Sequence, residues 1–260
     1  MTRYPEFWSV TKPSVWQAPT GRKIAYHLTE GKGPLVVFLG GFMSDMSGSK
    51  AVYLQEWAVR SGRAFLRFDY SGHGVSEGAF VDGAIGDWYA DAEGLIAHVS
   101  SGPVVLVGSS MGGWISFLIA RAGLVDVVGM VTIAAAPDFT EDGFFASFDA
   151  PTREILDREG VVHVPSDYGA PYPITKRLIE DGRNHLVMRQ PLGLPFAVRM
   201  VQGTEDASVT RETALGLLDH VSCEDVRLML VRGKNHSFSD DDCLKIIEQQ
   251  IEDVLGLAGV

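Results

Sequence analysis

The sequence predicts an α/β domain in which helices flank a mostly parallel β-sheet. Short apolar runs, each ending in glycine or a polar loop, alternate with longer segments of helical periodicity, which is typical of βαβ units. A length of 260 residues suits one large domain, or a domain with an insertion. With 46% hydrophobic and 21% charged residues, the composition is that of a globular chain able to bury a sizeable core.

Seven apolar runs are predicted to be strands. The first, residues 23–30, follows a Pro-Thr-Gly turn and is expected to pair antiparallel. The later six are expected to be buried strands, because each is continuously apolar and closes in glycine or a polar loop. They are residues 34–40, 64–70, 103–108, 127–135, 195–203 and 226–233.

Five segments between these strands show helical periodicity. The last of them begins with the acidic run Asp240 to Asp242, which favours a helix start because carboxylates stabilise the N-terminal turn. The predicted helices are residues 50–61, 87–99, 111–122, 210–220 and 240–255.

One interval breaks the alternation. Residues 138–194 are rich in Pro, Asp, Gly and aromatic residues, and they are too many for a simple crossover loop. We therefore expect an inserted lid at 138–194, and a core made of residues 1–137 and 195–260.

Charge and cysteine usage exclude several function classes. A net charge of −11 disfavours a nucleic-acid surface, which needs clustered Lys and Arg. Cys223 and Cys243 follow no metal or redox spacing, and we expect them to be buried or half-buried thiols in a reducing compartment. No apolar run is long enough to span a membrane, and the N-terminal residues lack signal- or transit-peptide character. The prediction is a cytoplasmic protein that needs neither a cofactor nor a metal.

The stretch "VVLVGSSMGGW" contains a candidate nucleophile. It fits the pattern G-x-S-x-G only with Ser110 at the centre, because Ser109 has Val107 two positions before it. An apolar strand precedes the motif and a helical pattern follows it, as in a nucleophile elbow, where Gly108 and Gly112 would avoid collision across the turn. The alternative is a glycine-rich turn of a nucleotide-binding protein, but neither G-x-G-x-x-G nor GK[ST] is present.

A serine nucleophile needs a histidine base, and in this type of site the base follows in the chain. His236, in "GKNHSFS", comes directly after the last predicted strand, where substrate-binding loops gather. His185 lies in the expected lid, where a lid or surface role is favoured. His220 ends a predicted helix, which favours a structural role.

The acid that orients the histidine should lie on a loop before it. Glu205 and Asp206 follow the penultimate strand in "VQGTEDASV", and the spacing from Gly203 to Val209 favours Asp206. Asp138, after "VTIAAAP", is the rival candidate.

An oxyanion hole needs two backbone N–H groups aimed at one oxygen. One is expected from Met111, the residue after the nucleophile. The second is expected from Phe42, because the Gly40-Gly41 pair lets the chain pass close to the site. Without the triad, Gly40-Gly41 could be a plain turn.

With Ser110, Asp206 and His236 in this order, the chain resembles the α/β-hydrolase superfamily over nearly its full length. "FDYSGHGVSEG" is similar to a segment that follows the fourth strand in many members, and there Asp69, His73 and Ser76 are structural rather than catalytic. The resemblance implies an eight-stranded, mostly parallel sheet flanked by helices, with an inserted lid.

Four motifs narrow the resemblance to the mitochondrial acyl-protein thioesterase family, whose animal member also hydrolyses the acyl glucuronide of mycophenolic acid. They are "FLGGFMSDMSGSKA", "RFDYSGHGVSEG", "GSSMGGW" and "GKNHSFS". The family's nucleophile, acid and base match Ser110, Asp206 and His236. Two departures are the missing transit peptide, which implies a bacterial cytoplasmic relative, and Gly40, where many superfamily members have histidine.

Two groups in the expected lid have alternative interpretations. Phe144, Phe145 and Phe148 could line an acyl pocket, although aromatic residues at this spacing are typical of a core. The side chains of Lys176, Arg177, Arg183 and His185 could bind an acidic leaving group such as a glucuronate, or form a solvated helix face.

The hypothesis is a serine hydrolase, a carboxylesterase or thioesterase acting through an acyl-enzyme. Its partner would be a small-molecule or acylated-protein ester or thioester, and the activity could be that of an acyl-protein thioesterase or an acyl-glucuronide esterase. A perhydrolase or a lyase on the same fold, and a small-molecule receptor that retains the triad, are the alternatives. A dehalogenase is disfavoured, because it would have a carboxylate where this chain has Ser110.

Overall fold

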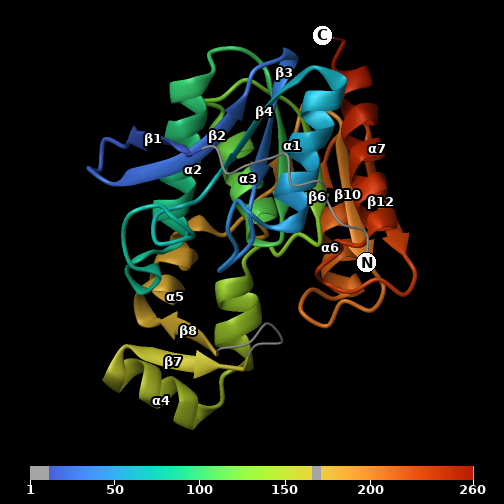
Figure 1. Ribbon diagram of the computed structural model, residues 1–260. Helices are drawn as coiled ribbons and strands as arrows, with labels where there is room; N and C mark the ends of the chain where they lie inside the picture. Colours follow the sequence, from blue (N-terminus) through green and yellow to red (C-terminus); the bar gives the residue numbers. More distant parts are fainter. Residues whose placement is uncertain (1–11, 166–170, 260) are drawn as a thin grey trace.

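The central feature of the fold is an eight-stranded sheet, seen in the computed structural model, which describes residues 12–165 and 171–259 (Figure 1). Strands β1 and β2 pair antiparallel, β2 is antiparallel to β4, and the remaining pairs are parallel. From one edge to the other the strands are β1 (Ser14–Gln17), β2 (Lys23–Thr29), β4 (Arg63–Phe68), β3 (Lys32–Leu39), β5 (Val104–Ser109), β6 (Val127–Ile133), β10 (Val198–Gly203) and β12 (Val226–Val231). The predicted eight-stranded, mostly parallel sheet is confirmed, although β1 was not among the predicted strands.

Two of the expectations extend beyond the described residues. Most of the N-terminal stretch that lacks signal-peptide character falls in residues 1–11, and residues 166–170 are part of the expected lid. Neither stretch is described by the structure.

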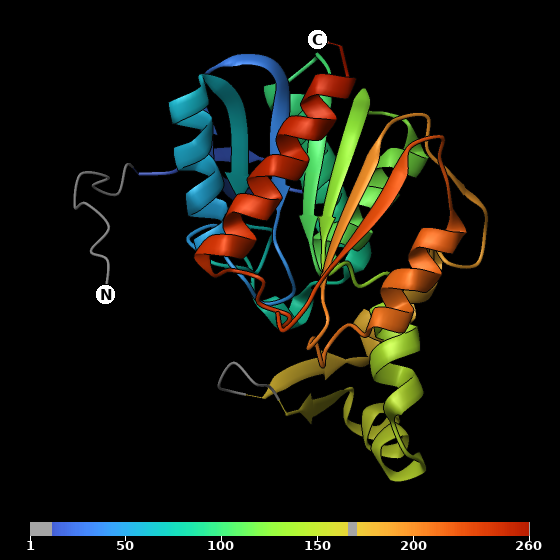
Figure 2. The ribbon, with the colours of Figure 1, turned by 90° about the vertical axis from the view of Figure 1, so that its right-hand side faces the viewer.

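Helices cover both faces of the sheet (Figure 2). Helices α1 (Ser49–Ser61) and α7 (Asp241–Leu257) pack on one face around a core that includes Trp57 and Ile247. The other face is covered by α2 (Ile85–Val99), α3 (Met111–Ala122) and α6 (Arg211–His220). Asp240 caps α7 by accepting a hydrogen bond from the Cys243 N–H, so the predicted acidic start of this helix is confirmed.

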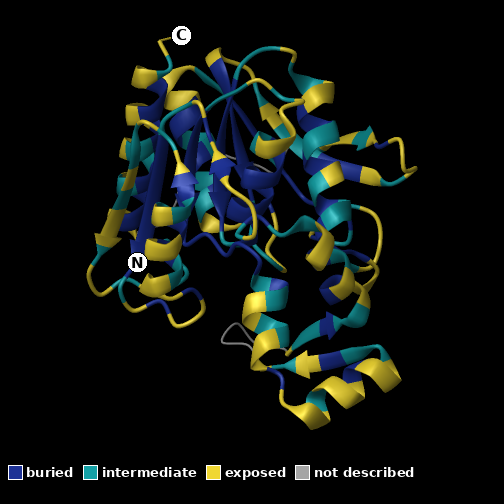
Figure 3. Ribbon diagram, turned by 180° about the vertical axis from the view of Figure 1, so that it is seen from behind, coloured by how far each residue is buried: buried dark blue, intermediate teal, exposed yellow. Residues whose placement is uncertain are grey.

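The predicted burial of the last strand is wrong. Strand β12 is the edge of the sheet, and its Met229 and Leu230 side chains are 39% and 42% exposed (Figure 3). The apolar run indicated a strand correctly, but β12 has only β10 as a neighbour and is not covered like the central strands. The two cysteines agree with the expectation, since Cys243 is buried, Cys223 is half-buried, and both are free thiols.

Between β6 and β10 the chain leaves the sheet and forms what we call the inserted segment, which lies below the sheet in Figure 1. A short β7–β8 hairpin and two helices make up most of it, and β9 pairs with β11 (Val221–Ser222) of the core. Its elements are the π-helical η2 (Phe139–Phe145), α4 (Ala150–Glu159), β7 (Val161–Val164), β8 (Tyr172–Thr175), α5 (Lys176–Gly182), the 3-10 turn η3 (Arg183–His185) and β9 (Leu192–Gly193).

Candidate active site

Ser110 occupies a strained turn between β5 and α3. Its φ of 54° and ψ of −116° lie in a region that non-glycine residues rarely adopt. A Cβ on Gly108 would lie 2.4 Å from the carbonyl oxygen of Gly112, and a Cβ on Gly112 would lie 2.1 Å from that of Leu39. Only glycine fits at both positions, so the sequence G-x-S-x-G and the geometry of a nucleophile elbow coincide here.

Three loops bring Ser110, His236 and Asp206 together. The His236 Nε2 lies 3.1 Å from the Ser110 Oγ, and the His236 Nδ1 lies 2.8 Å from an oxygen of Asp206. The loops follow β5, β10 and β12, and because these strands are parallel, their carboxyl ends meet at the same edge of the sheet. The three residues that the sequence singled out are therefore joined in one hydrogen-bonded chain.

Asp206 is held as a buried carboxylate. Its oxygens accept hydrogen bonds from the backbone N–H groups of Ser208 and Val209 and from the Gln202 side chain, at 2.8–2.9 Å. Burial acts to raise the pKa of Asp206, but the hydrogen bonds from His236, Val209 and Gln202 outweigh it, so the pKa is lowered overall. An ionised Asp206 can accept a hydrogen bond from the His236 Nδ1–H, which would leave Nε2 to accept one from the Ser110 hydroxyl.

Asp138, the rival candidate for the acid, has a structural role. The carboxylate of Asp138 is fully buried and accepts hydrogen bonds from the N–H groups of Val187 and Met188, at 2.8 and 3.0 Å. It therefore anchors the returning end of the inserted segment. The structure pairs His236 with Asp206, and with neither Asp138 nor Glu205.

The two other candidate histidines lie in structural settings. The His220 Nε2 is 2.9 Å from the carbonyl oxygen of Val187, close to the Asp138 anchor. His185 lies beside Asp181 in the inserted segment, and its ring tilts against Tyr89 of α2. Both placements agree with the interpretation made from the sequence.

The predicted oxyanion donors both belong to segments next to Ser110. Met111 begins α3 directly after Ser110, and Phe42 belongs to the turn after β3. This turn lies against the elbow, since a Cβ on Gly41 would lie 3.4 Å from the Ser110 Cβ, at ordinary van der Waals contact. Among the described residues neither the Phe42 nor the Met111 N–H donates a hydrogen bond to the protein, so both can serve a ligand.

A buried histidine fixes the chain next to Phe42. The N–H of Met43, which has a φ of 56°, donates to the His73 Nε2 at 3.3 Å. Burial lowers the pKa of His73 to about 4, against the opposing effects of its contact with the Ser71 carbonyl and of the Asp45 charge. A neutral ring donates from Nδ1 to the Ser71 carbonyl oxygen, 3.2 Å away, and accepts at Nε2.

Asp69 and Ser76 brace the same loop. The carboxylate of Asp69 accepts from the N–H groups of Met46 and Val75, at 2.6 and 2.9 Å. The Ser76 hydroxyl donates to the Asp69 carbonyl oxygen and accepts from the Ala25 N–H. The structural role expected for this motif agrees with these contacts, but its link to Phe42 was not anticipated.

The aromatic residues of the inserted segment pack as a core. Phe148 is buried, and Phe145 lies against it beneath the guanidinium groups of Arg153 and Arg183. Phe144 instead contacts the ring of Phe42. These contacts favour the core alternative over an acyl pocket for Phe145 and Phe148.

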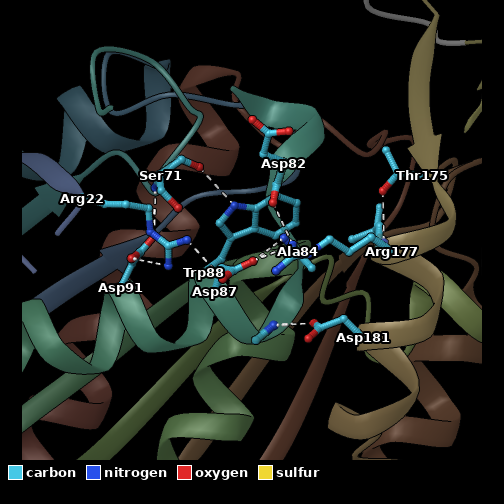
Figure 4. Close-up of polar contacts among 12 residues, drawn as sticks. Arg22, Ser71, Asp82, Ala84, Asp87, Trp88, Asp91, Thr175, Arg177 and Asp181 are labelled. Carbon is cyan, nitrogen blue, oxygen red and sulfur yellow. Dashed lines mark hydrogen bonds and ion pairs between the residues drawn. The ribbon is translucent and has the colours of Figure 1, made fainter. Parts of the chain in front are cut away.

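The basic side chains of this segment are paired with carboxylates. Arg177 lies 2.7 Å from Asp87 at the start of α2, as Figure 4 shows, and Arg183 lies 2.7 Å from Glu141. Lys176 lies 2.8 Å from Asp157. These pairs hold the segment together and hold it to the core, and they offer no support for binding an acidic leaving group.

Within residues 12–165 and 171–259, no group of three or more His, Cys, Asp or Glu side chains is placed to hold a metal ion. No helix in these ranges has the length and apolarity required to cross a bilayer.

Comparison with known proteins places the chain in a family. Residues 32–158 match the serine aminopeptidase S33 family. Mitochondrial palmitoyl-protein thioesterase ABHD10 from Bos taurus is 31% identical over 250 residues, covering 94% of this chain and 80% of the relative. The chain belongs to the ABHD10 family of α/β-hydrolases. The resemblance drawn from the four motifs is thereby confirmed.

Two solved structures are similar to this chain over almost its whole length. A putative hydrolase from Agrobacterium vitis S4 is 35% identical with a TM-score of 0.88, covering 94% of this chain and 98% of its own. The mouse α/β-hydrolase domain-containing protein 10 is 28% identical with a TM-score of 0.86, and the coverages are 95% and 99%. Family and relatives support hydrolysis of ester or thioester bonds as the class of activity.

Proposed function

We propose that the chain is a serine hydrolase that cleaves thioesters or activated carboxylic esters through an acyl-enzyme formed on Ser110. The observation that carries this proposal is the chain of contacts from Ser110 Oγ to His236 and from His236 to Asp206, at 3.1 and 2.8 Å. Membership of the ABHD10 family supports the same class of reaction.

In the first step the Ser110 Oγ attacks the substrate carbonyl carbon while His236 Nε2 takes its proton. The carbonyl oxygen becomes an oxyanion, which the N–H groups of Phe42 and Met111 would hold. Asp206 stabilises the protonated imidazole. When the tetrahedral intermediate collapses, the bond to the thiol or alcohol breaks, and His236 delivers the proton to the leaving group.

In the second step a water molecule replaces the leaving group. His236 takes a proton from this water, whose oxygen attacks the acyl carbon, and the second oxyanion uses the same two N–H groups. Collapse releases the carboxylic acid and returns the proton to Ser110. The reaction needs no group beyond the residues named and water.

For the substrate we favour an S-acyl thioester, on a protein or on a small carrier, because the matched mammalian relatives bear the name palmitoyl-protein thioesterase. We assign the lid function to residues 138–194, which the structure describes except at 166–170. A cytoplasmic location stays a prediction, and the mammalian relatives are named mitochondrial.

The test is hydrolysis of matched substrates by the wild type and two serine variants. The panel holds p-nitrophenyl esters of increasing chain length, an S-acyl peptide with its oxyester twin, an acyl-CoA and an acyl glucuronide. Ser110→Ala should lower kcat by a factor on the order of 10⁶. Ser109→Ala is the matched control, because the neighbouring hydroxyl is buried in β5 and should leave turnover near the wild-type value.

The outcomes separate the alternatives. Preference for the S-acyl peptide over its oxyester twin supports a thioesterase, whereas preference for the glucuronide supports an acyl-glucuronide esterase. Labelling of Ser110 by a fluorophosphonate without turnover of any substrate would favour a receptor, or a perhydrolase or lyase. Ser110→Ala with wild-type turnover would refute the proposal.

A further inference from the structure

The side chain of Phe42, whose backbone N–H is the second donor proposed for the oxyanion hole, is surrounded by a box of five aromatic rings. The contacts are edge-to-face or tilted, which is the favoured geometry for aromatic pairs. The distances between ring centroids are 4.9 Å to Phe80, 5.4 Å to Phe139, 5.6 Å to Tyr172, 6.0 Å to Phe144 and 6.0 Å to Trp88.

The box is built from two parts of the molecule. Phe80, in η1 (Phe80–Asp82), and Trp88, in α2, belong to the core. The other three rings belong to the inserted segment, two in η2 and one in β8. Removing the inserted segment from the core would therefore strip most of the packing from the Phe42 ring.

The inserted segment is fastened beside this box by polar contacts. Arg177 of α5 pairs with Asp87 and also donates to the Asp82 carbonyl oxygen, at 2.7 and 2.8 Å. Asp181 accepts from the Gly86 N–H at 2.7 Å. Figure 4 shows these side chains converging on the start of α2, next to Trp88. The inserted segment is thus attached to the core by contacts that do not involve Phe42.

The backbone of the 41–43 turn has few restraints of its own. The Met43 N–H is fixed by His73, and the Ser44 N–H and hydroxyl contact the Gly41 carbonyl oxygen at 3.2 and 2.8 Å. The Phe42 N–H itself is bonded to nothing in the described chain. The contacts of the Phe42 ring are therefore the main further restraint on this residue.

We propose that Phe42 is a positioning residue that acts through its ring. Contacts between the inserted segment and this ring set the direction of the Phe42 backbone N–H in the oxyanion hole. Phe139, Phe144 and Tyr172 act through Phe42 and touch no reacting atom. The inference rests on the proposed function, since it requires the Phe42 N–H to bind the oxyanion. A donor misplaced by about 1 Å can cost roughly 100-fold in rate, so the effect should appear in kcat.

The experiment measures steady-state hydrolysis of a short p-nitrophenyl ester, whose acyl group needs no long binding site. Phe144→Leu should lower kcat about tenfold with KM within twofold, and Phe42→Leu should lower kcat further. The double variant should be no slower than Phe42→Leu alone, because the Phe144 ring acts through Phe42. Phe145→Leu is the matched control, since its ring packs on Phe148 and away from Phe42.

Folding and chemistry are separated by two readouts. Thermal unfolding defines a temperature at which each variant is folded, and Tyr172→Leu replaces Phe144→Leu if the latter does not fold. A change confined to KM or to the melting temperature would overturn the inference, as would a double variant whose loss is the product of the single losses. If Ser110→Ala stays active, the proposed function fails. If Ser110→Ala is inactive but the Phe144 and Phe42 variants keep the wild-type kcat, the inference fails and the proposed function stands.

Discussion

The nucleophile elbow and the 41–43 turn lie side by side, yet they are held in different ways. Backbone packing against glycine fixes the elbow, at Gly108 and Gly112. The turn is fixed by side chains that come from elsewhere: His73 from a neighbouring loop, and aromatic rings from the inserted segment. The elbow therefore belongs to the core alone, whereas the 41–43 turn, which carries the proposed oxyanion donor, has contacts with both parts of the molecule.

The largest expected effect comes from breaking the elbow. In Gly112→Ala the new Cβ would lie 2.1 Å from the Leu39 carbonyl oxygen and 2.7 Å from that of Gly40, and neither backbone atom can move cheaply. We expect a loss of more than about 4 kcal/mol in the free energy of unfolding, or no folded protein, measured by urea denaturation.

The control uses a glycine with open space around it. Gly216 lies in α6, is exposed and has no atom near its would-be Cβ. Gly216→Ala should raise the free energy of unfolding by about 0.5–1 kcal/mol, because alanine favours the helix and restricts the unfolded chain. Equal stability of the two variants would show that the elbow does not need glycine at 112.

The next effect tests the turn through pH. His73 titrates near its usual 6.5 when unfolded, but burial lowers its folded pKa to about 4. A lowered folded pKa contributes stability above pH 6.5, and this stability is lost as pH falls toward 4. The linked loss between pH 7 and pH 4 is about 3 kcal/mol.

The comparison is urea unfolding at both pH values for the wild type and His73→Gln, whose amide oxygen can still accept the Met43 N–H. The variant should lack the His73 contribution. Buried carboxylates with raised pKa values, such as Asp69 and Asp91, act equally in both proteins and cancel in the difference. Parallel pH dependences would mean that His73 is not buried as a neutral ring.

The same contrast explains what the sequence could predict. The elbow is formed by residues that are adjacent in the sequence, so G-x-S-x-G between a strand and a helix indicated Ser110. Chain order and loop position indicated Asp206 and His236. The supports of the turn are not local, because Met43 and His73 are 30 positions apart. Phe42 meets Phe139 and Tyr172 only after the inserted segment has folded back, and no spacing rule predicts that contact.

Errors at the sheet edges have a related cause. The apolar run of β12 indicates a strand but not its neighbours, so its exposure at the edge was missed. Strand β1 is only four residues long, and three of the four are exposed, so it carries little periodic signal. Sequence pattern reports local preference, whereas burial depends on which elements become neighbours.

The smallest expected effect concerns the fastening of the inserted segment. Arg177 is half exposed, so Arg177→Leu should cost no more than about 1 kcal/mol of stability at low salt, and less at 1 M NaCl, where surface pairs are screened. Lys176→Leu is the control, because Lys176 pairs with Asp157 and Glu180, which lie within the segment itself. Because Asp181 still accepts from the Gly86 N–H and the aromatic contacts of Phe42 are unchanged, kcat should stay at the wild-type value in both variants. A fall of kcat in Arg177→Leu but not in Lys176→Leu, at both low and high salt, would contradict this expectation. It would mean that the Arg177 contacts, and not the aromatic rings, orient the Phe42 N–H.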